Sequence, residues 1–388
     1  MKIRMLGAIT IATVMAVSAC GSSGSDKSAP TTTGGASISC TNGTGPWGWC
    51  GDAKTGFLAP NQPDNNAGNN GNGKFVIGIL SPGDTHDHGY YQSFVDEAQR
   101  FADAHGGTVT TIDKVPPASA AQDARNLCRR KPDMIAIAAS TLKDAIPVAS
   151  EAVCKNTLWY VAGGEGVVQT KYFAQTNDIP SQSGYASGVA AGLLMKSKGI
   201  AKAGFITGFQ ATFTTNFEKA WETGIKSQVP DAKVVATYTG DFDKSDLAVE
   251  AYSAMKAQGV GIVYPYLGGA TDAVALQAAK DHVLTLTPGT DRCSSTNPPF
   301  AISVIFSPGD YFAGALERFG ARTLRVGTAL TFHMGVDAVP TVKICLSAQP
   351  TAGEAKVLAQ TIADIGTGKI NTGTITGLDD YNGYTPKS

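Results

Sequence analysis

Residues 83–91 read GDTHDHGYY and follow an apolar run at residues 75–80. His86 and His88 flank Asp87, and in an extended segment the two imidazoles point to the same side, where they could share a metal ion. A zinc site needs more ligands than two histidines, and the chain's other three histidines lack HxxxH spacing. Tyr90 and Tyr91 follow at once, and aromatic rings stack well on flat ligands. We therefore expect a ligand-stacking loop and no metal ion.

Sequence patterns that would indicate catalysis or nucleic-acid binding are absent. Residues 184–188 read GYASG, in which the serine is one place late for a nucleophile elbow, and no GxxxxGK[ST] phosphate loop occurs. A net charge of -1 with 16% charged residues lacks the basic excess of a nucleic-acid binder. The sequence therefore indicates a binding protein that is not an enzyme and uses no cofactor.

The N-terminus has the pattern of an exported lipoprotein. Lys2 and Arg4 precede an apolar stretch at residues 5–16, and residues 17–20 read VSAC. Small residues end a signal peptide, and a cysteine directly after them is typical of a bacterial lipoprotein. We expect residues 1–19 to be removed and Cys20 to carry the lipid, which would hold the protein at the extracytoplasmic face of the cell membrane. The alternative is an ordinary signal peptide with a chance cysteine.

Residues 20–73 are rich in Ser, Gly, Thr and Asn and are predicted to form a flexible tether. With Cys20 set aside, six of the seven cysteines remain in a compartment where disulfides persist. None has CxxC spacing, and nothing in the pattern supports a redox role. Proximity and context favour three pairs: Cys40 with Cys50, Cys128 with Cys154, and Cys293 with Cys345.

From residue 74 onward, strand-like and helix-like patterns alternate. The predicted strands are residues 75–80, 108–112, 134–138, 157–162, 202–206, 233–238 and 261–264; the predicted helices are residues 91–104, 118–129, 142–154, 183–196, 215–228, 245–257 and 270–281. Such alternation indicates an α/β fold with parallel sheets flanked by helices. Two such series in succession predict two lobes. We assign residues 74–178 with part of 304–345 to the first lobe, and residues 179–303 with part of 346–388 to the second.

Ligands bind at the carboxyl ends of parallel strands. This rule places five segments at the rim of a cleft between the lobes: residues 83–91, 163–166, 208–213, 264–269 and 287–291. The rim carries aromatic side chains, among them Phe209 and Tyr264, whose faces can stack on a flat ring. Asp87 and Asp291 supply acceptors for hydroxyl or N–H groups. The rim therefore predicts a site for a small ligand.

Four segments resemble the basic membrane protein family of lipoproteins, which are nucleoside-binding substrate receptors of ABC importers with a type I periplasmic-binding fold. Residues 87–93 (DHGYYQS) resemble its Asp-x-x-Phe-Asn-x-Ser loop, and residues 184–192 (GYASGVAAG) its Tyr-Leu-Ala-Gly-x-x-Ala-Gly helix. Residues 204–208 (GFITG), followed by Asn216 and Phe217, are similar to its Gly-Phe-x-Gly-Gly strand. Residues 259–269 (GVGIVYPYLGG) resemble its turn ending in Ala-Gly-Gly.

The resemblance implies a purine nucleoside as ligand and an ABC permease as partner, with the protein acting as a monomer. It implies that Asp87 contacts the base, that Tyr90 stacks on it, and that Gly268 and Gly269 lie near it. Residues 289–291 (GTD) match the family's Gly-x-Asp, so Asp291 is the expected ribose contact.

The chain departs from the family where Tyr91 replaces an asparagine and where Phe306 stands in place of a lysine that reaches the ribose. Two alternatives therefore stay open. The ligand could be a sugar or another small polar molecule. The chain could also be a cell-envelope interaction protein that reuses the fold, with the loop between Cys40 and Cys50 as its contact.

Overall fold

The computed structural model describes residues 57–58, 74–164, 166–168 and 170–376. The predicted signal peptide, Cys20, Cys40, Cys50 and all of the predicted tether except residues 57–58 lie outside the described residues. Among those described, no helix combines the length and apolar character that a membrane span needs.

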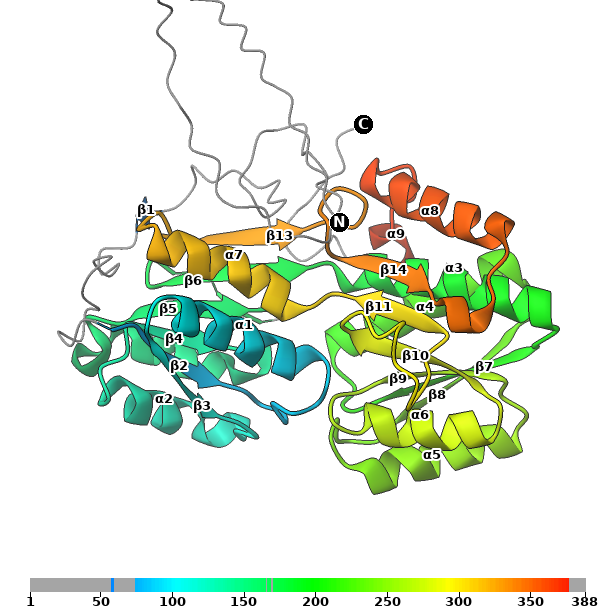
Figure 1. Cartoon of the computed structure of the whole chain (residues 1–388), viewed down its shortest axis with the longest axis horizontal. Coiled ribbons are helices and arrows are strands. Elements are labelled where there is room, and N and C mark those ends of the chain that lie inside the picture. Colours follow the sequence, from blue (N-terminus) through cyan, green and yellow to red (C-terminus); the bar gives the residue numbers. More distant parts are fainter. Residues whose placement is uncertain (1–56, 59–73, 165, 169, 377–388) are drawn as a thin grey trace, which may run out of the picture. The chain divides into compact units, whose positions relative to one another are not determined.

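The first sheet has six strands in the order β13-β6-β5-β4-β2-β3, and every neighbouring pair is parallel (Figure 1). Its strands are β2 (Val76–Leu80), β3 (Thr108–Ile112), β4 (Met134–Ile137), β5 (Leu158–Ala162), β6 (Phe173–Asp178) and β13 (Thr328–Phe332). The segments around it are α1 (Tyr90–Ala104), η1 (Pro117–Ser119), α2 (Ala120–Cys128), η2 (Ser140–Ser150), η3 (Ala152–Cys154) and α7 (Pro308–Gly320). A further short pair, β1 (Phe57–Leu58) with β12 (Arg325–Val326), is antiparallel.

The second sheet has six strands in the order β14-β11-β10-β9-β7-β8, parallel except for β14. Its strands are β7 (Lys202–Thr207), β8 (Lys233–Tyr238), β9 (Ile262–Tyr266), β10 (Leu284–Gly289), β11 (Ile302–Ile305) and β14 (Thr341–Ile344). Its helices are α3 (Pro180–Lys198), α4 (Thr212–Gln228), α5 (Ser245–Ala257), α6 (Thr271–Lys280), η4 (Leu346–Ala348), α8 (Ala352–Gly366) and α9 (Gly373–Thr376). Two largely parallel sheets flanked by helices confirm the predicted α/β class.

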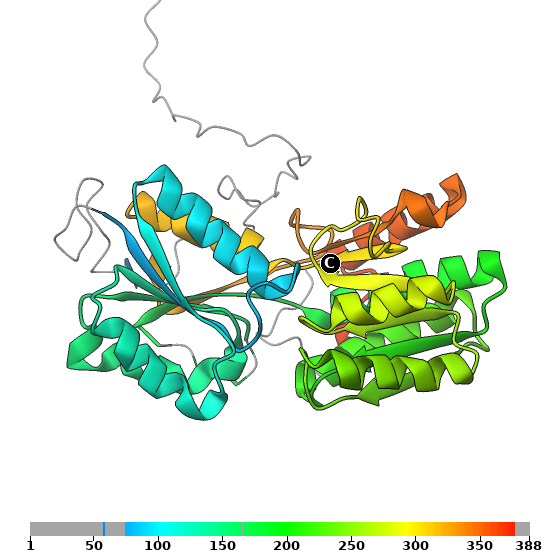
Figure 2. The ribbon, with the colours of Figure 1, turned by 60° about the horizontal axis from the view of Figure 1, so that its bottom comes forward.

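Each sheet is covered by helices on both faces, as Figures 1 and 2 show. Successive strand residues point to opposite faces, so a strand buried on both sides contributes to two cores. In β4, Met134 and Ala136 pack with the aromatic residues of α1 and α7, whereas Ile135 and Ile137 pack with α2 and η2. The second sheet also contributes to two cores: α3, α4 and α8 pack in one of them, and α5 and α6 pack in the other.

The chain passes between the two sheets three times. It crosses after β6 into α3, returns after β11 into α7, and crosses again between β13 and β14. Because the strands of both sheets are mostly parallel, the loops at their carboxyl ends gather at one edge of each sheet. This arrangement brings segments that are far apart in the sequence to one place.

The predicted helix at residues 142–154 is wrong in type. The structure has two 3₁₀ segments there, η2 and η3, separated at Glu151, which has an extended backbone. Pro147 lies inside η2 and has no N–H to donate, so an α-helical hydrogen-bond ladder cannot run through it. The 3₁₀ segments still place Cys154 in the core, where it pairs with Cys128.

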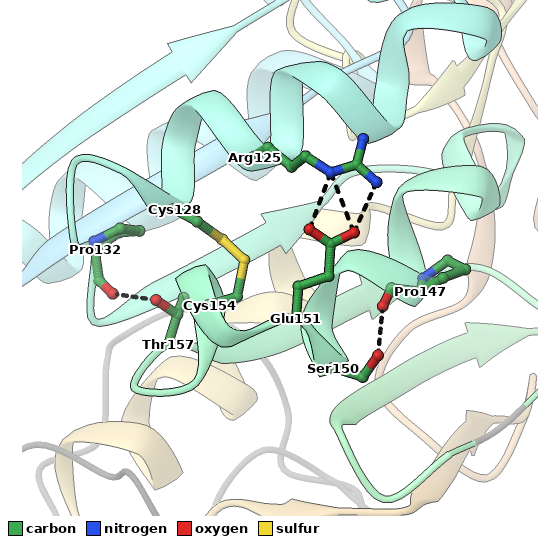
Figure 3. Close-up of a disulfide and its surroundings, with 8 residues drawn as sticks. All are labelled: Arg125, Cys128, Pro132, Pro147, Ser150, Glu151, Cys154 and Thr157. Atoms are coloured by element: carbon green, nitrogen blue, oxygen red, sulfur yellow. Dashed lines mark hydrogen bonds and ion pairs between the residues drawn. A yellow bond between two sulfur atoms is a disulfide. The ribbon is translucent and has the colours of Figure 1, made fainter.

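Two of the three predicted disulfides are confirmed. Cys128 at the end of α2 bonds Cys154, with Cα atoms 5.2 Å apart (Figure 3). One turn earlier on α2, the guanidinium of Arg125 donates to both carboxylate oxygens of Glu151. Cys293 bonds Cys345 just before η4, with Cα atoms 4.9 Å apart. This second bond ties the loop after β10 to the end of β14.

Candidate ligand-binding site

A small recess lies where loops from the two sheets meet. It is lined from the first sheet's side by the start of α1 and from the second sheet's side by the β9–α6 loop and the end of β10. We call these nine lining residues the recess: Asp87, Gly89, Tyr90, Leu267, Gly268, Thr271, Thr287, Pro288 and Arg292. Every element that contributes to it does so at the carboxyl end of a strand or the first turn of a helix, as the parallel topology requires.

Asp87 is held at the start of α1 by backbone donors. The first N–H groups of a helix have no partner within the helix, and the Asp87 carboxylate accepts from Gly89 at 2.9 Å, Gln92 at 3.0 Å and Tyr91 at 3.1 Å. The side-chain oxygen of Gln92 in turn accepts a hydrogen bond from the backbone N–H of His88. Burial raises the pKa of Asp87, against the effect of these hydrogen bonds. The carboxylate is thus fixed in position at the start of α1, beside the recess.

Tyr90 is the first residue of α1 and is half-buried. Its ring lies edge-on to Tyr91 at 5.2 Å between centroids and 6.1 Å from Phe306. Its backbone approaches Gly289 so closely that a Cβ there would lie 3.1 Å from the Tyr90 nitrogen, and Gly289 has a φ of +92°. A side chain at position 289 would therefore be strained, and glycine lets the end of β10 reach the start of α1.

Gly268 and Gly269 form the turn after β9 and lie against Asp243. The Asp243 carboxylate accepts from the Gly269 nitrogen at 2.7 Å, and a Cβ on Gly268 would lie 2.6 Å from the same oxygen. The other Asp243 oxygen accepts from the backbone of Asp84, which follows β2, at 3.4 Å. Thr271 then begins α6 and is buried. One carboxylate therefore joins the loops of the two sheets beside the recess.

Arg292 supplies the cation of the recess. Its guanidinium donates through Nη1 and Nη2 to the two carboxylate oxygens of Asp272, in the first turn of α6, and lies 4.6 Å above the ring of Phe300. The Arg292 side chain retains 13% exposure. The Nδ1 of His88, from the loop before α1, lies 3.1 Å from the same Asp272. The site thus combines an aromatic ring, hydroxyls, a carboxylate and a neutralised guanidinium.

Five predicted site residues do not line the recess: Gly269, whose backbone N–H binds Asp243, and four residues with longer side chains. Tyr264 is fully buried with its hydroxyl in the core, because its position in β9 points it at Phe205 and Trp221. Phe209 is 52% exposed and packs edge-on against Phe242. The ring of Tyr91 turns toward Gly83. Asp291 forms an ion pair with Lys343 at 2.6 Å and accepts from the backbone of Cys293. In this structure, the side chains of these four residues therefore contact other parts of the chain and do not face the recess.

The two histidines have different surroundings and do not share a ligand position. His86 is exposed and lies with Asp84 and Asp113, whose ligand atoms are close enough to hold an ion. Asp84, however, already forms an ion pair with Lys114 at 2.8 Å. His88 has a φ of +53° and turns toward Asp272. The assumption of an extended segment, on which a shared metal site rests, therefore fails.

Sequence reasoning missed Arg292 and Thr271. Thr271 comes two residues after the predicted Gly268–Gly269 turn, and Arg292 directly follows the predicted Asp291. The only sequence feature that could have indicated them is their position, because each residue comes shortly after the carboxyl end of a predicted strand or rim segment. Neighbouring residues in a loop point in different directions, so sequence could not indicate that Arg292, rather than Asp291, faces the recess.

Residues 74–365 match the family model described as "Bmp: ABC transporter substrate-binding protein PnrA-like". The chain belongs to the Bmp family. This confirms the family resemblance read from the motifs at residues 87–93, 184–192, 204–208 and 259–269. The family consists of substrate-binding proteins of ABC transporters, and the described recess lies within the matched residues.

Known proteins similar to this Bmp family member support the same assignment. The "ABC transporter nucleoside-binding protein BmpA" of Lactococcus lactis subsp. cremoris (strain MG1363) is 30% identical over 146 residues, which are 36% of this chain. The chain spans 40% of the length of that curated relative.

Solved structures show the same fold. An ABC transporter solute-binding protein from Conexibacter woesei DSM 14684 aligns with a TM-score of 0.61 at 20% identity, covering 76% of this chain and 98% of that one. One from Aeropyrum pernix K1 aligns with a TM-score of 0.67 at 15% identity, covering 76% and 92%. These alignments confirm the predicted type I periplasmic-binding-protein-like fold.

Proposed function

We propose that this Bmp family member is a lipid-anchored extracytoplasmic receptor that captures a purine nucleoside in the recess and delivers it to an ABC importer. The observation that carries the proposal is the position of Tyr90 beside Asp87, Thr271 and Arg292 in one recess. A flat base needs an aromatic face, and a nucleoside also carries several polar groups that require buried partners.

The ligand class draws support from family membership and from the name of the Lactococcus relative. Both rest on sequence similarity to one family, and neither depends on the geometry of the recess. Asp87 and the glycines of the turn, Gly268 and Gly269, keep their proposed roles as an acceptor for the base and a close backbone approach. The proposed contact of Asp291 with the ribose requires that its ion pair with Lys343 breaks when the ligand binds.

The proposal of a membrane anchor rests on residues 17–20, which read VSAC and end in Cys20. A lipid at Cys20, followed by a long polar tether, would keep the binding unit close to a permease while leaving it free to reorient. Mass spectrometry of the mature N-terminus would test this part separately. A mature chain that starts at any residue other than an acylated Cys20 contradicts it.

The experiment for the ligand is isothermal calorimetry on the purified full chain, after partial unfolding and refolding to remove carried ligand. The panel contains inosine, guanosine, adenosine, uridine, free bases, sugars and zinc. We expect binding of purine nucleosides and loss of about 1–3 kcal/mol of binding free energy in Tyr90→Ala, because stacking of a base on an aromatic ring is of that size. Tyr90→Phe keeps the ring and should bind nearly as wild type does.

Tyr172→Ala is the matched control, since Tyr172 is 42% exposed and lies outside the recess. It should leave the affinity unchanged. Binding of sugars with no response to purine nucleosides would move the assignment to the sugar alternative. Binding of zinc alone would make the loop at residues 83–91 a metal site.

A further inference from the structure

Arg292 lines the recess and forms a bidentate ion pair with Asp272. We propose that Arg292 is a ligand-binding residue that donates hydrogen bonds to an acceptor on the ligand, and that Asp272 neutralises it so that the recess selects uncharged nucleosides over nucleotides. This inference rests on the proposed nucleoside function and deepens it.

Arg292 is rigidly held and still has donors to offer. Its backbone N–H donates to Ser303 Oγ at 3.0 Å, the neighbouring Cys293 is tied to Cys345, and its guanidinium lies over Phe300. Each of Nη1 and Nη2 donates once to Asp272, and the guanidinium has further N–H groups beyond these two. Because Arg292 lines the recess, those groups can meet a carbonyl, ring nitrogen or hydroxyl of a bound ligand.

The charges around the recess disfavour a phosphate. The positive charge of Arg292 is offset by Asp272, against which His88 also lies, and the carboxylate of Asp87 lines the opposite side of the same recess. Asp243 lies just behind Gly268 and Gly269. A phosphate dianion would therefore lie beside the carboxylates of Asp87 and Asp243 without a free cation among the recess residues to offset its charge, whereas a neutral acceptor needs only the polarised N–H groups of the guanidinium.

The test compares inosine with inosine 5′-monophosphate by calorimetry on the full chain. Wild type should bind inosine at least about tenfold more tightly. Arg292→Gln should weaken inosine binding about tenfold to a hundredfold, the loss expected for a hydrogen bond from a charged donor. Asp272→Asn frees the positive charge, so it should narrow the preference for inosine over its monophosphate by about tenfold. A purely structural role of the ion pair would not change this ratio.

The chain offers a matched control in Arg125 and Glu151, another bidentate pair beside a disulfide but outside the recess (Figure 3). Arg125→Gln and Glu151→Gln should leave both affinities unchanged. Should Arg292→Gln fail to fold, Arg292→Lys keeps the charge and loses the planar donors, and Arg292→Gln with Asp272→Asn removes both charges. Each should weaken inosine binding.

Two results would overturn the inference in distinguishable ways. If wild type binds inosine and the Arg292 variants that fold bind it within twofold of wild type, Arg292 does not contact the ligand, while the nucleoside function stands. If wild type binds no nucleoside, the proposed function is wrong and this inference falls with it.

Discussion

The carboxyl group of Asp178 shows how the fold changes the chemistry of a single residue. Asp178 ends β6 and is paired in register with Phe332 of β13, against which the ring of Tyr311 stacks at 4.3 Å. The buried Tyr311 hydroxyl has no hydrogen-bond partner among the described residues. Burial raises the pKa of Asp178 to about 7 from an ordinary value of 3.8. At a pH between these two pKa values, the Asp178 carboxyl group is therefore protonated in the folded chain and ionised in the unfolded chain.

This difference predicts a pH-dependent stability. Since the folded state holds the extra proton, the free energy of unfolding falls as the pH rises from about 4 to about 7. Asp178→Asn removes the ionisation, so the variant should exceed wild type by about 1–3 kcal/mol at pH 8 and by little at pH 4. Urea unfolding at the two pH values measures this. Asp231→Asn, at an exposed position, should show no such change, and a pH-independent difference for Asp178→Asn would contradict the prediction.

At the scale of elements, the close contact of α3 with α4 depends on glycine. Gly184, Gly188 and Gly192 recur every four residues along α3 and form one stripe. A Cβ on Gly188 would lie 2.1 Å from the carbonyl oxygen of Trp221 on α4, and one on Gly224 would lie 2.3 Å from that of Tyr185. The two backbones thus approach each other as closely as glycine allows.

Gly188→Ala should lower the free energy of unfolding by about 1–3 kcal/mol or more, because a methyl group cannot fit without separating the helices. The measurement is urea unfolding, with Gly353→Ala as the matched control. Gly353 lies in the first turn of α8, where a Cβ would have 3.8 Å to its nearest neighbour. That change should be neutral or stabilising, since alanine favours helix more than glycine does. Equal effects at both positions would show that backbone propensity, rather than packing, dominates.

For the whole molecule, Asp243 is one of the contacts that join the loops of the two sheets. It accepts from Asp84 after β2 and from Gly269 after β9, on either side of the recess. A receptor that closes around its ligand binds well only in the closed arrangement. If only a fraction of the molecules adopt that arrangement before binding, the apparent affinity is lowered in proportion to this fraction. Removing a hydrogen bond that favours this arrangement therefore weakens binding without removing a ligand contact.

Asp243→Ala should raise the dissociation constant for inosine about fivefold, equivalent to about 1 kcal/mol. Calorimetry on the full chain measures it, and Asp246→Ala serves as control because Asp246 is exposed in the first turn of α5. An unchanged dissociation constant would mean that this contact does not influence ligand capture.

Much of the architecture could be predicted from local pattern. The strands at residues 108–112 and 233–238 and the helix at residues 245–257 have the bounds that the sequence indicates. Hydrophobic periodicity and turn residues are local properties of the sequence, so they indicate helices and strands even when the fold is unknown. Beyond residue 281 no elements were predicted, and there the chain crosses twice between the two sheets, after β11 and after β13, which local pattern does not reveal.

By itself, the sequence determined the α/β class, the family and two disulfides. Only the tertiary structure decided which rim residues meet. Tyr264 is buried because of its place in β9, and Arg292 rather than Asp291 lines the recess because a loop tied by Cys293 turns it there. In strands and loops one residue of register reverses the direction of a side chain, and register depends on contacts between distant segments.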